Sequence, residues 1–139
     1  MIKNYYYLAL GILSIILSFS HAWNGQTITL PLIEASSIDL ITKTTFFYVW
    51  HIITAENLVF SGVFLVMAFY KDLSKVRFAA WLIAIILIAR WFVIFGSTLF
   101  KNTNGLIDLL TDTIAIIIYI GLIILGARVK DKISVYKRL

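Results

Sequence analysis

Four long apolar stretches constrain what this chain can fold into more than any other feature of its sequence. They cover residues 5–23, 46–70, 78–100 and 106–127. A helix needs about 20 mostly apolar residues to cross a bilayer, and each stretch has about that length or more. Charged residues make up only 14% of the chain, whereas a soluble domain carries about 25%. The sequence therefore predicts an all-α integral membrane four-helix bundle, a single domain over residues 1–139.

Lysine and arginine are distributed unevenly between the two sides of these spans. Nine of the twelve fall on one side, and five of those nine lie in a basic tail at 128–139. Only Lys43 and Lys101 fall on the other side, while Arg90 lies within a span. Because cytoplasmic loops carry the excess of Lys and Arg, both termini are predicted to be cytoplasmic. A bacterial inner (plasma) membrane is the expected location.

The basic tail at 128–139 is expected to contact anionic lipids, where each cation near the leaflet contributes ~1 kcal/mol. The net charge of +5 does not indicate nucleic-acid binding. The cations are confined to loops and tail, and no nucleic-acid-binding motif accompanies them. The chain has no cysteine, which excludes disulfides, thiolate nucleophiles and Fe–S clusters.

The connections between the spans differ in length. An outer loop is predicted at 24–45, and Pro31 divides it. Ser36-x-x-Asp39 resembles a capping box, so the second helix is expected to begin near Ile38, above the membrane. The third and fourth spans are joined by a short Asn- and Gly-containing turn around 102–105, which predicts that they pack as antiparallel neighbours.

Two spans carry stripes of small and polar residues at helical spacing. The first has Tyr7, Gly11, Ser14, Ser18 and His21, and the fourth has Asp108, Asp112, Ala115, Tyr119 and Gly126. Residues three and four apart share one face of a helix, and small residues let helices approach closely in lipid. Both stripes are therefore predicted to face neighbouring helices.

The second span contains an unusual polar stretch at 47–60, with His51, Thr54, Glu56 and Asn57 within seven residues. At 100° per residue, Tyr48 and Thr54 share the face of His51, whereas Glu56 lies about 140° away. This helix is therefore expected to have neighbours on at least two sides.

Depth in the bilayer suggests how the buried charges pair. At ~1.5 Å per residue, His51 and Asp112 both lie roughly 10 Å below the outer boundary, and Glu56 and Arg90 both lie roughly 15 Å below it. A charge at the centre of a span costs ~2.5–3.5 kcal/mol, so pairing is strongly favoured. We predict a Glu56–Arg90 pair and a His51–Asp112 pair.

Intramembrane ionisable residues commonly mark ion and solute paths or proton relays. The best-supported function is therefore binding or proton-linked transport of a small solute or ion, with a homodimer expected because four helices rarely enclose a pathway. The candidate residues for this ligand site or proton relay are His51, Glu56, Arg90, Asp112, Tyr48, Thr54 and Tyr119.

Two alternatives stay open. The polar pairs could be structural, in which case the protein would be a non-catalytic accessory or assembly subunit of a larger membrane complex. The chain could also carry electrons, with His21 and His51 binding haem, or with Asp108 helping them to hold a metal; haem is possible but not favoured, and the cofactor is left open. No nucleophile or phosphate-loop signature indicates an enzyme.

Overall fold

The computed structural model describes residues 1–129, and its regular structure within this range is helical throughout, with no strand. Four continuous helical segments are long and apolar enough to cross a membrane: Tyr5–Ala35, Leu40–Phe69, Leu73–Lys101 and Thr103–Arg128. The predicted basic tail lies outside the described residues, apart from Arg128 and Val129. In chain order the elements are α1 (Tyr5–Asn24), η1 (Gly25–Thr29), α2 (Leu30–Ala35), α3 (Leu40–Phe69), α4 (Leu73–Lys101), η2 (Thr103–Leu106) and α5 (Leu109–Arg128).

The predicted outer loop at 24–45 is wrong, because most of it is helical. The chain continues from α1 through a π-helical turn, η1, into α2. Proline lacks an N–H and its ring clashes with the carbonyl of residue i−4 in a regular α-helix. The wider π turn just before Pro31 relieves that conflict, with Leu30 N–H bonded to the carbonyl of Gly25.

Short polar side chains set where the long helices begin. Asn4 caps α1 by accepting from the N–H groups of Tyr6 and Tyr7, and Asp72 caps α4 in the same way through Ser74. Asp39 caps α3 through Thr42, so this helix does begin close to the predicted position. The predicted capping box is wrong, since Ser36 ends α2 and bonds back to Ile33.

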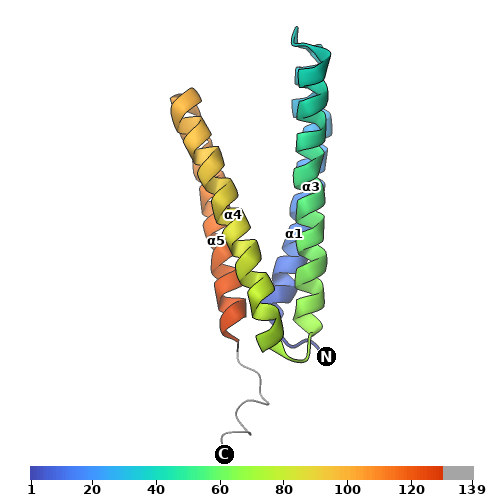
Figure 1. Ribbon diagram of the computed structural model, residues 1–139, viewed down its shortest axis with the longest axis vertical. Coiled ribbons are helices and arrows are strands. Elements are labelled where there is room, and N and C mark those ends of the chain that lie inside the picture. The colour runs from blue at the N-terminus through green and yellow to red at the C-terminus, as the bar shows by residue number, and fades with distance from the viewer. Residues whose placement is uncertain (130–139) are drawn as a thin grey trace, which may run out of the picture.

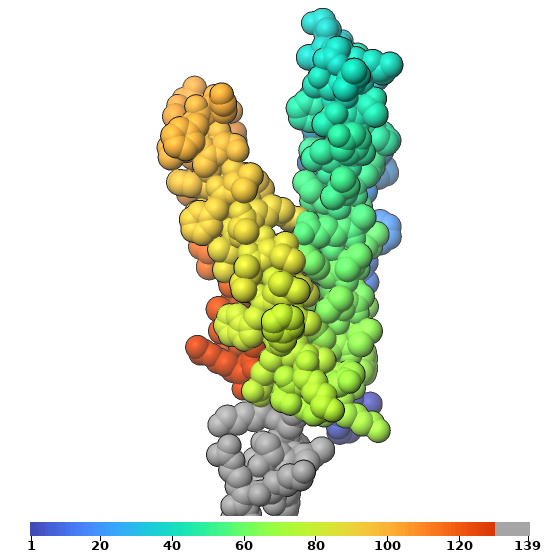
Figure 2. All heavy atoms as spheres, in the orientation of Figure 1, coloured from blue at the N-terminus to red at the C-terminus, as the bar shows by residue number. Residues whose placement is uncertain are grey.

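The helices form two hairpins, one of α1 with α3 and one of α4 with α5 (Figure 1). The hairpins meet at the end where α1 begins and α5 ends, and they diverge toward the opposite end. We call the half of the molecule that holds the shared core the closed half. The half beyond Glu56 and Arg90 is the open half, and the space between its two hairpins, visible in Figure 2, is the cleft.

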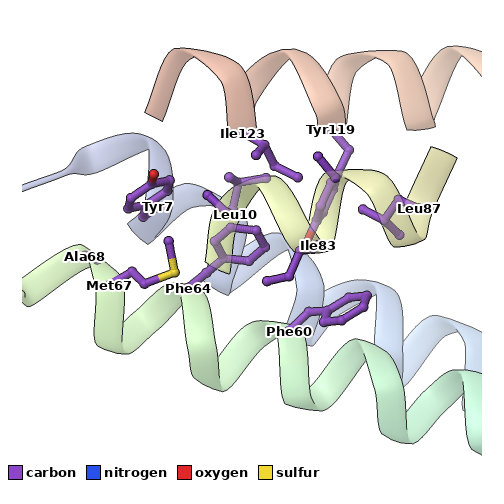
Figure 3. Close-up of a cluster of buried hydrophobic side chains, with 12 residues drawn as sticks. Tyr7, Leu10, Phe60, Phe64, Met67, Ala68, Ile83, Leu87, Tyr119 and Ile123 are labelled. Carbon is purple, nitrogen blue, oxygen red and sulfur yellow. The ribbon is translucent and has the colours of Figure 1, made fainter. Parts of the chain in front are cut away.

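All four long helices contribute side chains to the core of the closed half. Figure 3 shows Met67 of α3 extending toward Tyr7 of α1, and the Phe64 ring lies near both Tyr7 and Tyr119 of α5, with ring centroids 5.9 and 6.1 Å away. The core consists of Tyr7, Leu10, Phe60, Phe64, Met67, Ala68, Ala80, Ile83, Ala84, Leu87, Tyr119 and Ile123. Helices therefore pack on one another in this half as they do in a compact bundle.

Small residues bring the backbones together in the closed half, as the stripe on the first span predicts. A Cβ on Gly11 would lie 2.7 Å from the Leu65 side chain, and one on Gly126 would lie 2.5 Å from the ring of Tyr7. Ser61 donates to the Gly11 carbonyl (2.9 Å). These contacts tie α1 to α3 on one side and to α5 on the other.

Candidate functional site

The predicted Glu56–Arg90 pair is confirmed. Nη1 of Arg90 donates to Oε2 of Glu56 at 2.8 Å, which joins α4 of one hairpin to α3 of the other. The two side chains remain 26% and 29% exposed, respectively. The ion pair is therefore reachable, and it lies where the closed half gives way to the cleft.

Helical periodicity identifies the side chains that line the cleft. The core face of α3 at Phe64 and Phe60 continues through Glu56 to Ile53, and that of α4 at Leu87 continues through Arg90 to Ile94. On α5 the face of Tyr119 continues to Ala115 and Asp112, both exposed. The cleft thus contains an ion pair and a carboxylate among apolar side chains.

The predicted His51–Asp112 pair does not form. Nε2 of His51 accepts from the side-chain amide of Gln26 at 2.9 Å, and its ring packs edge-on against Phe47. His51 thus faces η1 in its own hairpin, on a different side of α3 from Glu56. The expectation that this helix has neighbours on two sides is confirmed, because Glu56 contacts α4 and His51 contacts η1.

The two aspartates of α5 lie near the mouth of the cleft. Asp108 precedes α5 without a side-chain capping bond, and Asp112 lies in the first turn of the helix. Both are exposed. Within residues 1–129 neither carboxylate has a salt-bridge partner, so the unpaired charge on this face of α5 is negative.

His21 belongs to a rigid contact between α1 and α3. Its ring stacks on Trp50 with centroids 4.3 Å apart, and its Nε2 donates to the Trp50 carbonyl (3.3 Å). The Trp50 indole N–H donates in return to the His21 carbonyl (3.0 Å). Gly25 makes room for the indole, since a Cβ there would lie 2.0 Å from Trp50 Nε1.

Tyr119, the predicted site residue of α5 below the ion pair, belongs to the core of the closed half. Its hydroxyl is buried and hydrogen bonded to the hydroxyl of Ser14, which joins α5 to α1. Its ring packs edge-on against Phe64 of α3. Tyr119 is therefore a packing contact between three helices and does not line the cleft.

The remaining predicted site residues lie elsewhere. Tyr48 is exposed and its hydroxyl contacts only Thr45, at 3.4 Å. The Thr54 hydroxyl is buried and has no hydrogen-bond partner in the described part of the chain. For metal binding, no group of three or more His, Asp and Glu side chains comes together within residues 1–129, so His21, His51 and Asp108 do not converge.

An apolar groove lies apart from the cleft, between α4 and α5. Its volume is about 150 Å³, and it is lined by Ile88, Trp91, Thr113, Ile116, Ile117 and Ile120. The Trp91 indole donates to the Thr113 hydroxyl across it (3.0 Å). This hydrogen bond joins α4 to α5 in the second hairpin, and the residues that line the groove include no ionisable group.

Sequence reasoning missed several residues that position the site. Asn4 is buried, and its amide donates to the Gly126 carbonyl at 2.8 Å; its place directly before a helix was an available capping signal. Gln26 and Trp50 have no such signal. Gln26 reaches His51 only because residues 25–29 are helical, and Trp50 reaches His21 only because α1 and α3 pack as a hairpin.

The geometry offers a limited chemistry. A carboxylate and a guanidinium in contact can bind groups of opposite charge, and the carboxylate can take up a proton. Comparison of the chain with protein-family models, with curated proteins and with solved structures finds no match.

Proposed function

We propose that this chain is a multi-pass membrane protein with both termini in the cytoplasm, and that a bacterial inner (plasma) membrane is its location. The uneven distribution of Lys and Arg supports this orientation. The start of α1 and the end of α5 lie at the same end of the molecule, which suits an even number of crossings (Figure 1). The cleft would then open to the outside.

We further propose that the cleft binds a small polar solute or ion from the outside, as a binding protein or a proton-linked transporter. The observation that carries this proposal is the Glu56–Arg90 pair. It joins the two hairpins at the closed end of the cleft, and over a quarter of each side chain is exposed. Ionisable side chains within membrane-spanning segments commonly mark a ligand path, and the exposed part of each side chain lets a ligand reach the pair.

Thiol labelling tests whether the cleft is open to water. Because the chain has no cysteine of its own, only the introduced cysteine can react. Ala115 lies on the cleft face of α5, and Ile117 lies in the apolar groove on another face. We expect a membrane-impermeant maleimide added outside intact cells to modify Ala115→Cys and not Ile117→Cys. Thr103→Cys, in the connection between α4 and α5, should also react from outside only.

Protection of Ala115→Cys to the same degree as Ile117→Cys would contradict solute access. Reaction of Thr103→Cys from the cytoplasmic side would overturn the orientation. Both measurements use the full chain in its membrane and need no knowledge of the ligand.

A second candidate function, an accessory or assembly subunit, is favoured by one observation. Val49 of α3 and Ile94 of α4 extend the core faces into the open half but remain 44% and 40% exposed. A helix of a partner, or of a second copy in a homodimer, would cover them. A protected Ala115→Cys together with a stoichiometric co-purifying subunit would favour this role.

A further inference from the structure

We infer that the ligand of the cleft is a small zwitterion, with its anionic group on Arg90 and its cationic group on Glu56. This inference rests on the proposed binding function and deepens it by naming the substrate class. Three features of the charged residues lead to it.

The first feature is charge balance. Arg90 and Glu56 neutralise each other at 2.8 Å, and each side chain is partly buried. A simple anion bound to Arg90 would leave the Glu56 carboxylate without a partner. A simple cation bound to Glu56 would leave the Arg90 guanidinium without a partner. Leaving one partner of a buried pair without compensation is strongly unfavourable. A ligand that carries both charges replaces one ion pair with two and leaves neither residue unpaired.

The second feature is the placement of the pair on different hairpins. Glu56 belongs to α3 and Arg90 to α4, and both lie about one helical turn beyond the core residues Phe60 and Leu87, toward the end where the hairpins diverge. A zwitterion between the two side chains would still connect the hairpins. A ligand with one charge would remove that connection. Binding of a zwitterion is therefore expected to stabilise the arrangement of the two hairpins.

The third feature is the sign of the unpaired charge near the mouth of the cleft. Asp108 and Asp112 are exposed on α5 and have no salt-bridge partner within residues 1–129. The two carboxylates outnumber the one exposed cation at the end of α4, Lys101, so they repel a simple anion and attract a cationic group. The ligand therefore needs a cationic end to approach and an anionic end to satisfy Arg90.

Thermal unfolding of the full chain in lipid nanodiscs tests the inference. The probes are glycine, β-alanine and γ-aminobutyrate, whose charges are separated by different numbers of carbons. The controls are acetate, methylammonium and an equimolar mixture of the two. We expect a saturable rise in unfolding temperature with at least one zwitterion, at concentrations where none of the controls has an effect.

Charge-removing variants make the test specific to the two residues. Arg90→Met should bind the effective zwitterion at least about tenfold more weakly and should respond instead to methylammonium. Glu56→Gln should likewise lose the zwitterion and respond to acetate. Asp39→Asn, at the start of α3 and outside the cleft, is the matched control and should bind as the unchanged protein does.

Each other outcome overturns the inference in a distinct way. Equal stabilisation by acetate or by methylammonium would make the site one for simple anions or simple cations. If no probe acts although Ala115→Cys is labelled from outside, the zwitterion assignment is wrong while the open cleft stands. If no probe acts and Ala115→Cys is protected, both proposals fail together.

Discussion

The closed half and the open half are built from the same four helices, yet only one of them is packed. In the closed half, small residues of α3 and α4, namely Ala68, Ala80 and Ala84, are buried in the shared core. Where the two helices enter the open half, they meet through Glu56 and Arg90, whose long side chains touch only at their tips. Small residues allow close helix approach in a membrane, whereas an ion pair of two long side chains holds the helices apart. The contact residues therefore set the spacing of the helices.

The difference lies between the hairpins and not within them. At the far end of the first hairpin, Trp50 stacks on His21 and fills the space left by Gly25. The second hairpin is joined at a comparable place by Trp91 and Thr113. Each hairpin is thus held along its length, and the cleft separates two firm units.

Substitution of glycine tests this comparison most strongly. Gly126→Ala would place a Cβ 2.5 Å from the fully buried ring of Tyr7, while Gly96→Ala in the open half meets nothing within 4 Å. Overpacking typically destabilises by about 1–3 kcal/mol. We expect Gly126→Ala to lower the free energy of unfolding by about that amount, measured by denaturant titration in detergent micelles.

Gly121→Ala is the control on the same helix, since a Cβ there also meets nothing within 4 Å. Both Gly96→Ala and Gly121→Ala should cause no loss of stability and could raise it by up to about 1 kcal/mol, because alanine favours a helix more than glycine does. A loss at Gly96 as large as that at Gly126 would mean that the open half is packed against something, and the comparison would fail.

The ion pair at the boundary of the two halves gives the next largest effect. Glu56→Gln and Arg90→Met should each lower the free energy of unfolding by about 1–2 kcal/mol, a figure reduced because both side chains are partly exposed. The double variant should lose less than the sum, since the second change removes a charge already without its partner. Strictly additive losses in the double-mutant cycle would mean that the contact contributes nothing.

Sequence reasoning succeeded where one helix face was enough to decide a position. Ser14, Ser18, Tyr119 and Gly126 are buried as the two stripes predict, whereas Asp108, Asp112 and Ala115 of the second stripe are exposed and do not fit that prediction. The turn at 102–105 joins antiparallel neighbours. The four apolar segments are also predicted correctly as long helices, because their length and composition do not depend on any contact partner. These features follow from the local spacing of residues along one helix, and predicting them requires no knowledge of the distance between helices.

Sequence reasoning fails where a position depends on a distance across the molecule. Equal depth in the bilayer predicts contact between His51 and Asp112, but the diverging hairpins separate residues of equal depth. Glu56 and Arg90 still meet because they lie at the edge of the closed half. The prediction of an outer loop at 24–45 is wrong for a different reason. Pro31 indicates a break in the helix, and the π turn that accommodates this proline has no simple sequence signature.

A smaller effect is expected from the hydroxyl contacts of the closed half. The Ser14 hydroxyl is buried between the Leu10 carbonyl and the Tyr119 hydroxyl, whereas Ser20 on the same helix is exposed. Hydrogen bonds between membrane helices average about 0.6 kcal/mol. Ser14→Ala should destabilise by about that amount and Ser20→Ala by less. Equal effects in the same unfolding assay would remove Ser14 from the contact between α1 and α5.

The smallest effect should come from pH, through the aspartates that cap one helix in each half. Hydrogen bonds from the Thr42 hydroxyl, and then from the Thr42 N–H, lower the pKa of Asp39 at the open end. A hydrogen bond from the Ser74 hydroxyl lowers the pKa of Asp72 at the closed end.

A carboxyl group whose pKa is lower in the folded state contributes stability above its unfolded pKa, about 3.9. That contribution is lost as the pH falls from there through the folded pKa. Thermal unfolding should be measured from neutral pH down to values below the folded pKa. The unfolding temperature of Asp39→Asn and of Asp72→Asn should fall less with acid than that of the unchanged protein. Asparagine still caps a helix but does not titrate in this range. Because both carboxyl groups are exposed, the two differences should be small and similar. A difference confined to Asp72→Asn would mean that the start of α3 is already loose at neutral pH, and that the open half is less firmly held within its hairpin than its aromatic contacts indicate.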